Sequence, residues 1–145
     1  MIYLAAFALA MFGLLLRPVV VRGRSMEPTL HNGAWRIAAR WWLESQRQPG
    51  RGDVVIIRRV GNKVFYLKRI LGLPGERIQF NAGQLLVNDQ PIDESYRSGH
   101  SDWSMPAIRL GPDEYFVAGD NRSMPLADHT AGKVERRHLS GKLWP

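Results

Sequence analysis

The sequence contains no cysteine. This absence excludes a disulfide-stapled scaffold, a thiol nucleophile, an iron–sulfur cluster and every zinc site built on cysteine. Histidine is scarce, and its 4 copies are too scattered to form the closely spaced pair of an HExxH zinc motif. We therefore expect no metal and no cofactor, and any catalysis would depend on other side chains.

No long block of one charge is present either. The formal net charge is +7, but the bases stand in short pairs, Arg58/Arg59, Lys68/Arg69 and Arg136/Arg137. Neither a zinc finger nor an RNA-binding aromatic motif nor a clear helix-turn-helix pattern is evident. The positive charge is interpreted as a solvated basic surface or one that faces anionic lipid. Nucleic-acid binding is the weakest alternative, and nucleic acid is not an expected partner.

One long hydrophobic run is present, at the start of the chain. Met1 to Leu16 reads MIYLAAFALAMFGLLL and carries no charge. As a helix it would cover roughly 24 Å, short against a hydrocarbon core of about 30 Å. A cleaved signal peptide and a buried core helix are the alternatives, but the basic start of a signal peptide is missing. We expect a single membrane anchor over residues 1–17. On charge alone, Arg17, Arg22 and Arg24 would place the rest of the chain in the cytoplasm.

The chain after the anchor has the short hydrophobic period of β structure. With 145 residues in all, 45% hydrophobic and 23% charged, residues 18–145 are expected to form one folded β-rich domain. Most of it fits an antiparallel barrel-like or folded sheet, and the clearest helical pattern is Ile37–Arg47. The expected strands are Val19–Arg22, Val54–Ile57, Lys63–Ile70, Glu76–Phe80, Gln84–Val87 and Glu114–Ala118. The expected turns are Gly61-Asn62, Asn81-Ala82-Gly83 and Asn88-Asp89, and Asp93–Pro106 is the least regular loop.

Ser25 lies in a Gly-to-Pro turn, GRSMEPTL, directly after an expected strand. Such a turn can present a hydroxyl at a surface and leave backbone N–H groups free to bind an oxyanion. A serine in this setting is more often a simple turn residue. However, with no cysteine and only scattered histidines, a serine nucleophile would need another base, and lysine is the remaining option.

Lys68 is the candidate base. Strand alternation places it on the same face as Tyr66 and Ile70. Burial among apolar side chains disfavours the ammonium and lowers the pKa of a lysine, so that it can act as a base near pH 7–8. The alternative is an ordinary edge-strand lysine in water.

Four motifs in order give the chain a clear resemblance. SMEPTL stands at 25–30, GDVV at 52–55, YLKRILGLPGE at 66–76 and GDNR at 119–122, with a hairpin NAGQLLVNDQPI at 81–92. Together they resemble the type I signal peptidases, membrane-anchored Ser/Lys proteases that remove signal peptides from exported proteins.

The resemblance implies roles for individual residues. Ser25 would be the nucleophile, Lys68 the general base, and the Ser25 backbone N–H an oxyanion donor. Gly23 stands where some members have a serine that adds a second donor. Met26 would help to shape subsites for alanine at −1 and −3 of the cleavage site, and the substrate would bind as an added strand. The implied partners are signal-peptide-bearing preproteins and the lipid bilayer. The family places its catalytic domain on the export side, which overrides the charge argument.

The last motif departs from the family pattern, GDNRxxSxDSRxxG. Pro125 stands where the serine is expected, and Ala127, Asp128 and His129 take the Asp, Ser and Arg positions. A slip of one residue would instead make Asp128 the aspartate of the motif. The missing groups in the family orient the lysine and brace the site, so we expect a changed support around Lys68.

The first part of that motif is intact, as Asp120, Asn121 and Arg122. These residues either brace a tight turn or act in catalysis. Two alternatives to general signal-peptide removal remain open at this point. One is a specialised processing peptidase of the conjugative-transfer or mitochondrial inner-membrane type, and the other is a catalytically impaired homologue that only binds signal peptides.

Overall fold

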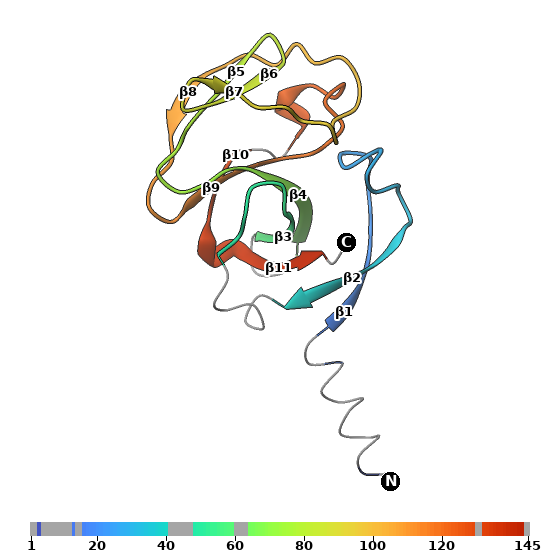
Figure 1. Ribbon diagram of the computed structural model, residues 1–145. Coiled ribbons are helices and arrows are strands. Elements are labelled where there is room, and N and C mark those ends of the chain that lie inside the picture. The colour runs from blue at the N-terminus through green and yellow to red at the C-terminus, as the bar shows by residue number, and fades with distance from the viewer. Residues whose placement is uncertain are drawn as a thin grey trace.

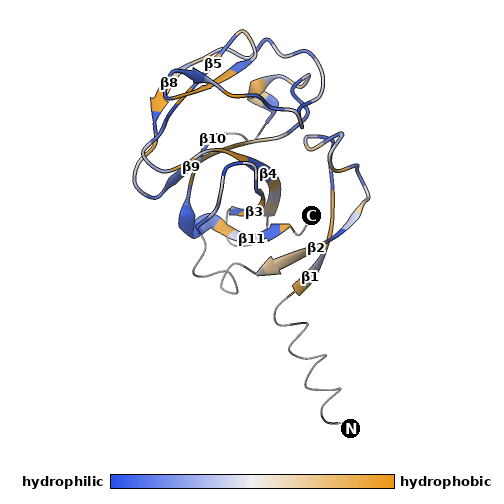
Figure 2. Ribbon diagram, in the orientation of Figure 1, coloured by the Kyte–Doolittle hydropathy of each residue, from blue (hydrophilic) through white to orange (hydrophobic). Residues whose placement is uncertain are grey.

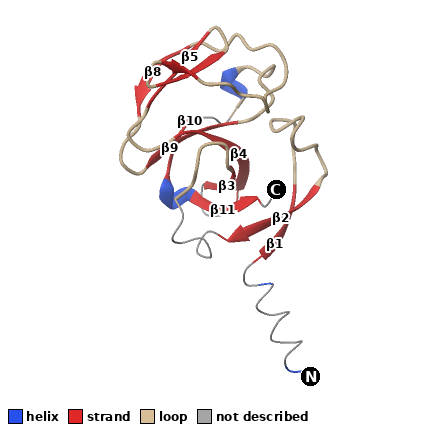
Figure 3. Ribbon diagram, viewed as in Figure 1, coloured by secondary structure: helices blue, strands red, loops and turns tan. Residues whose placement is uncertain are grey.

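The computed structural model describes residues 3, 13, 16–40, 48–59, 64–129 and 132–143. The predicted membrane anchor over residues 1–17 and the predicted turn at Gly61-Asn62 therefore fall largely or wholly outside the described residues. Within the described ranges, no helix is both long and apolar enough to cross a membrane. Strands and loops make up nearly all of this part of the chain, as Figure 3 shows.

Seven antiparallel strands form the larger of two sheets, in the spatial order β1-β2-β11-β3-β4-β9-β10. Runs rich in β-branched and aromatic residues explain the central strands, because such side chains pack well on a pleated surface. The strands are β1 (Leu16–Val20), β2 (Trp35–Arg40), β3 (Val54–Arg59), β4 (Val64–Gly72), β9 (Glu114–Ala118), β10 (Gly132–Glu135) and β11 (Leu139–Leu143). Two short 3-10 helices, η2 (Leu126–Asp128) and η3 (Arg136–His138), lie before and after β10.

The smaller sheet is inserted in the chain between β4 and β9. Its four strands run in the order β7-β6-β5-β8. They are β5 (Arg77–Asn81), β6 (Gln84–Val87), β7 (Gln90–Pro91) and β8 (Met105–Arg109). In Figure 1 this sheet lies at one end of the molecule, above β9 and β10, while β1 and β2 lie at the other.

The core consists of three clusters of buried side chains. One joins the smaller sheet to β9 through Phe80, Trp103 and Phe116, and a second lies on the larger sheet around Ile70. The third places Met26 of the Ser25 loop against Ile56 of β3. Figure 2 shows short hydrophobic stretches alternating with hydrophilic ones along the described ribbon, as expected for strands with one buried face. The third cluster matters most for function, because it anchors the serine turn to the sheet.

The strand predictions after residue 50 are confirmed in their main features. Val54–Ile57 and Lys63–Ile70 correspond to β3 and β4, which pair antiparallel. The hairpin around Asn81-Ala82-Gly83 joins β5 to β6, and Ala82 and Gly83 have the positive φ angles that such a turn uses. Glu114–Ala118 is β9. The irregular loop predicted to end at Pro106 ends slightly earlier, because β8 begins at Met105.

One prediction about the fold is wrong, and another is confirmed only in part. The helix predicted over Ile37–Arg47 is a strand in its described part, because Trp35–Arg40 pairs with both β1 and β11; residues 41–47 lie outside the described ranges. The barrel does not close among the described strands. Barrel closure would require the first and last strands to bond to each other, whereas β1 and β10 are the two edges of an open sheet. The mostly antiparallel β class itself is confirmed.

Candidate active site

Ser25 lies in the loop that connects β1 to β2. Backbone hydrogen bonds close this loop at its base, where the Val21 N–H donates to the Ala34 carbonyl and the Gly33 N–H donates to the Val21 carbonyl. Met26 and Leu30 bury their side chains beneath it. Gly23 has φ +89°, a conformation that side-chain-bearing residues rarely adopt, just before the serine. The turn therefore holds the half-buried Ser25 in a fixed place on the sheet.

Lys68 reaches Ser25 directly. The distance from Lys68 Nζ to Ser25 Oγ is 2.8 Å, a hydrogen bond between residues 43 positions apart. Lys68 is on β4, opposite Val55 of β3, and is only 3% exposed. Desolvation by burial lowers the pKa of Lys68 to about 8, although the Asp120 carboxylate acts in the opposite direction. About a tenth of Lys68 is therefore a free amine at pH 7, far more than for a lysine in water, and a free amine can accept a proton from the serine hydroxyl.

A cavity of about 340 Å³ opens beside this pair. Its walls come from β1, from β4 and from the serine loop, and Gly23, Ser25, Met26 and Lys68 all line it. The remaining wall is largely apolar, formed by side chains such as Val20 and Phe65. The four residues predicted for catalysis and substrate binding are thus brought together at one cavity.

The GDNR segment contacts the serine turn from behind. The Asn121 backbone N–H donates to the Ser25 carbonyl at 3.0 Å, and Asn121 Nδ2 donates to the Arg24 carbonyl at 3.1 Å. Asp120, which is completely buried, accepts two hydrogen bonds from Arg69 and one from Thr29 Oγ1 at 2.6 Å. These contacts fix the serine turn against the strand that carries Lys68.

Arg122 turns the other way, into the smaller sheet. Its guanidinium forms an ion pair with Glu94, and both side chains are almost fully buried. The guanidinium also lies 4.8 Å from the ring centroid of Trp103. Tyr96 donates its hydroxyl to Glu94, and burial is the main cause that raises the pKa of Tyr96. Arg122 therefore connects the motif to the core and does not line the cavity with Ser25.

At the altered end of the motif, residues 125–129, the structure buries only His129 among the four residues that depart from the family pattern. Pro125, Ala127 and Asp128 are exposed; Pro125 directly precedes η2, and the other two lie within it. His129 is buried, 3% exposed, and its Nε2 lies 2.8 Å from the Asn121 carbonyl oxygen. Asp128 is thus at the surface beside His129, while His129 occupies the interior position next to the GDNR turn.

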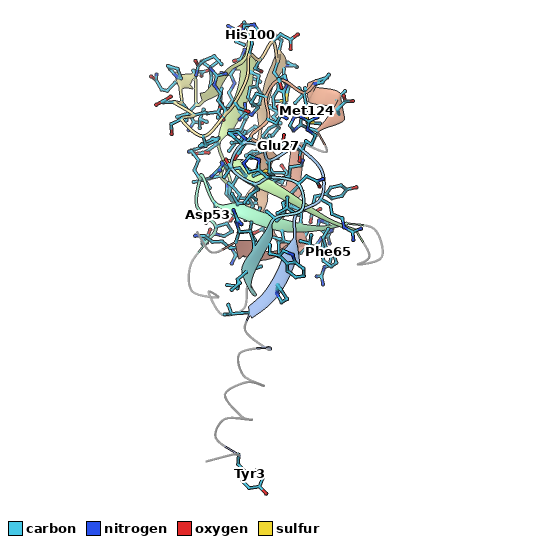
Figure 4. The ribbon with its side chains drawn as sticks, turned by 90° about the vertical axis from the view of Figure 1, so that its right-hand side faces the viewer. Tyr3, Glu27, Asp53, Phe65, His100 and Met124 are labelled. Carbon is cyan, nitrogen blue, oxygen red and sulfur yellow. The ribbon has the colours of Figure 1, made fainter. Side chains whose placement is uncertain are left out.

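Sequence reasoning missed several residues of this arrangement. Arg69 and Thr29 both lie inside recognised motifs, next to the lysine and four positions after the serine, so their link to Asp120 could have been suspected. Glu94 and Ser98 lie in the loop expected to be irregular. Ser98 Oγ donates to the Glu27 carbonyl in the serine loop, a contact between residues 71 positions apart that no local pattern reveals. In Figure 4 Glu27 lies below Met124 and above Phe65. No group of three or more metal-binding side chains is found within the described ranges.

The chain is similar to known proteins over most of its length. The family model described as signal peptidase, peptidase S26, matches residues 1–144. The chain is 32% identical over 146 residues to signal peptidase I S of Bacillus subtilis strain 168, covering 92% of this chain and 78% of that protein. It is 31% identical over 145 residues to signal peptidase I of Bacillus licheniformis, covering 92% and 77%.

A solved structure shows the same fold. The crystal structure of a signal peptidase I from Enterococcus faecalis V583 aligns with a TM-score of 0.53 and 24% identity, covering 68% of this chain and 98% of that one. Fold and relatives together define the class, and the protein is a serine endopeptidase, a hydrolase. The chain belongs to the signal peptidase family, peptidase S26.

Proposed function

We propose that this protein removes N-terminal signal peptides from exported proteins, with Ser25 as the nucleophile and Lys68 as the general base. One observation carries the assignment of the two residues. A buried lysine, with its pKa lowered to about 8, lies 2.8 Å from the hydroxyl of a serine at an apolar cavity. A nucleophile and a base within hydrogen-bonding reach are the arrangement that covalent catalysis by serine requires.

The chemistry would proceed in two halves. Neutral Lys68 takes the Ser25 Oγ proton as the oxygen attacks the carbonyl carbon of the scissile peptide bond. The Ser25 backbone N–H stabilises the oxyanion, and the Lys68 ammonium then gives its proton to the leaving amine. An acyl ester on Ser25 remains. Lys68, neutral again, deprotonates a water molecule that attacks the ester, and the serine recovers its proton as the carboxylic acid product leaves.

The substrate would bind along the cavity between β1 and β4. An extended peptide can add its backbone to strand edges while its alternate side chains enter the wall. Gly23 leaves open space beside Ser25, and Met26 is among the residues that line the cavity, where we expect small side chains such as alanine at −1 and −3 to bind. Signal peptides with alanine at these positions are the preproteins that we propose as partners.

The proposal is tested by cleavage of a synthetic precursor peptide by the full chain in detergent. Ser25→Ala and Lys68→Met should each reduce cleavage to background, while the melting temperature shows that the domain still folds. A serine-directed acylating probe should label the wild type at Ser25. Absence of both labelling and cleavage in a folded wild type would overturn the proposal and indicate an impaired homologue that only binds signal peptides.

We further propose that residues 1–17 anchor the protein in a membrane as a single pass, with the catalytic domain on the export side. The sixteen uncharged residues at the start support this, as do the exposed Trp35 and Ile37 on β2 and Phe65 on β4. Indole and other large apolar side chains favour the membrane interface. The full chain should resist alkaline extraction from membranes, whereas a chain that starts at Leu16, with β1 intact, should be released. Release of the full chain would contradict the anchor, and protection of the domain from protease added on the export side would contradict its orientation.

A further inference from the structure

His129 is a buried histidine to which the proposed mechanism assigns no role. It follows η2, is 3% exposed and lies edge-on to Trp103, with ring centroids 4.7 Å apart at 73°. Burial is the main cause that lowers the pKa of His129 to about 4, and the neighbouring Lys68 cation is the second. The imidazole is therefore neutral at any pH at which a lysine base can work.

The tautomer of the neutral ring follows from its one hydrogen bond. Nε2 lies 2.8 Å from the Asn121 backbone carbonyl oxygen, and a carbonyl can only accept. Nε2 therefore carries the proton and donates. Nδ1 of a neutral ring then has a lone pair and can only accept. Nδ1 is buried, and it has no hydrogen-bond partner in the structure.

Gly119 shows which way Nδ1 faces. A Cβ placed on Gly119 would be 2.8 Å from His129 Nδ1 and 2.1 Å from the carbonyl oxygen of Ser25. His129 Nδ1 and the Ser25 carbonyl oxygen thus both face the Cα of Gly119, where a side chain is absent. Lys68 Nζ is held at the same nucleophile by its bond to Ser25 Oγ, and it has N–H groups to donate besides the one in that bond.

We propose that His129 is a positioning residue for the lysine base, in which the Nδ1 lone pair, unpartnered in the structure, accepts a hydrogen bond from Lys68 Nζ when the lysine is an ammonium. This inference rests on the proposed Ser25/Lys68 mechanism and adds a fixed acceptor to it. Lys68 must become an ammonium each time it takes a proton, and in a buried site that charge needs a partner. The neutral imidazole supplies one without adding a charge, and its Nε2 bond to the GDNR turn fixes the direction of its lone pair.

The charges around the pair are few. Asp120 acts on Lys68, while Lys68, Arg122 and Asp128 act on His129. An ammonium offers three donors and an amine two, so an acceptor favours the ammonium and raises the pKa of the lysine. Removal of Nδ1 should therefore move the acid limb of the pH–rate profile downward while it reduces turnover.

Two amide substitutions at His129 distinguish the role of Nδ1 from that of Nε2. His129→Asn places an amide oxygen near the Nδ1 position, and His129→Gln places an amide NH₂ near the Nε2 position, where it can still donate to the Asn121 carbonyl. The full chain in detergent is assayed on the precursor peptide from pH 6 to 10. We expect Asn to retain kcat within about threefold and Gln to lose about ten- to a hundredfold in kcat, the range for one hydrogen bond to a charged group, with KM unchanged. The acid limb should move to lower pH in Gln alone.

The reverse result overturns the inference. If Gln behaves as wild type, or if both variants lose activity equally with the acid limb unmoved, His129 has a structural role through Asn121 only. A measurement that leaves residue 129 intact covers the case in which the variants fail to fold. The ¹⁵N shift of His129 Nδ1 should differ between the wild type and Lys68→Met, and identical shifts would refute the hydrogen bond. Ser25→Ala is assayed in parallel, and full activity there would instead refute the proposed function itself.

Discussion

Asp120 and Arg69 form a two-point ion pair behind Ser25 and Lys68. Arg69 donates from Nε to Asp120 Oδ1 at 2.9 Å and from Nη2 to Oδ2 at 2.6 Å. The same Oδ2 accepts from Thr29 Oγ1 at 2.6 Å. Arg69 follows Lys68 on β4, and Thr29 lies in the serine turn. One buried carboxylate thus joins the strand that carries Lys68 to the loop that carries Ser25.

The first prediction is that Asp120→Asn lowers both stability and activity. The substitution preserves shape but leaves the Arg69 guanidinium without its charge partner, and breaking a buried pair costs about 3 kcal/mol. Urea denaturation should show a loss of this size in the free energy of unfolding, and kcat on the precursor peptide should fall at least tenfold.

The matched control is Lys133→Gln. Lys133 pairs with Glu114 at 2.8 Å, but both side chains reach solvent, and ion pairs of this kind contribute little to stability. A loss of activity in Asp120→Asn without a loss of stability would contradict a bracing role and favour direct participation in catalysis.

The second prediction concerns Gly119→Ala. The added methyl carbon would be 2.1 Å from the Ser25 carbonyl oxygen, which is backbone and can move only if the serine turn moves. A displacement of about 1 Å at a catalytic group can reduce turnover about a hundredfold. We therefore expect a loss of this order in kcat, measured with the precursor peptide in detergent.

Gly111→Ala provides the comparison for this variant. Its Cβ would lie 3.3 Å from Glu114 Oε2, the far end of a flexible side chain, so activity should remain close to that of the wild type. Wild-type activity in Gly119→Ala would show that the turn yields without moving Ser25, contrary to this prediction.

Sequence patterns predicted the features that depend only on residues close together in the chain, such as strand faces and tight turns. Two-residue alternation is enough to place Lys68 on one face of a strand, and a Gly-to-Pro turn is enough to expose Ser25. The hairpin at Asn81-Ala82-Gly83 follows from turn chemistry alone. The resemblance then linked Ser25 to Lys68, which alternation could not have done.

The missed features depend on distant partners. Ile37–Arg40 has no strong local preference, and pairing with β1 and β11 on both sides decides in favour of a strand. Glu94 contributes to the buried core only through its ion pair with Arg122, which is 28 positions away in the sequence. The burial of His129 likewise depends on a distant residue, because its ring packs against that of Trp103. Side chains brought together over such separations leave no periodicity to detect.

The third prediction is the pH dependence of activity. Because burial lowers the pKa of Lys68 to about 8, the proton-accepting amine is lost as pH falls below that value. The value of kcat/KM should fall about tenfold per pH unit well below pH 8 and level off above it. It is measured from pH 6 to 10 with a peptide that has no group titrating in this range. Lys68→Arg should be inactive throughout, because a guanidinium remains protonated. An acid limb far below pH 8 would exclude Lys68 as the base, and an active Lys68→Arg would do the same.

The last prediction links the same lysine to stability. In the folded protein Lys68 loses its proton near pH 8, whereas in the unfolded chain it does so near 10.5. Between these values the unfolded state binds more protons, so this residue makes the free energy of unfolding rise with pH. Below pH 8 both states are protonated and the full cost of burying the ammonium is present, about 3 kcal/mol for a shift of this size.

Lys68→Met isolates this contribution. Methionine has a similar length and no charge, so the variant should be more stable than the wild type at pH 7, and the difference should shrink steadily between pH 8 and 10.5. Urea denaturation of both proteins at pH 7, 8, 9, 10 and 10.5 gives the difference directly. Tyr96, whose raised pKa makes stability fall with pH in the alkaline range, is present in both proteins and cancels in the difference. A difference that stays constant from pH 7 to 10.5 would mean that Lys68 keeps its ordinary pKa in the folded protein. The lysine could then serve as the base only for the small fraction of molecules that are deprotonated near neutral pH.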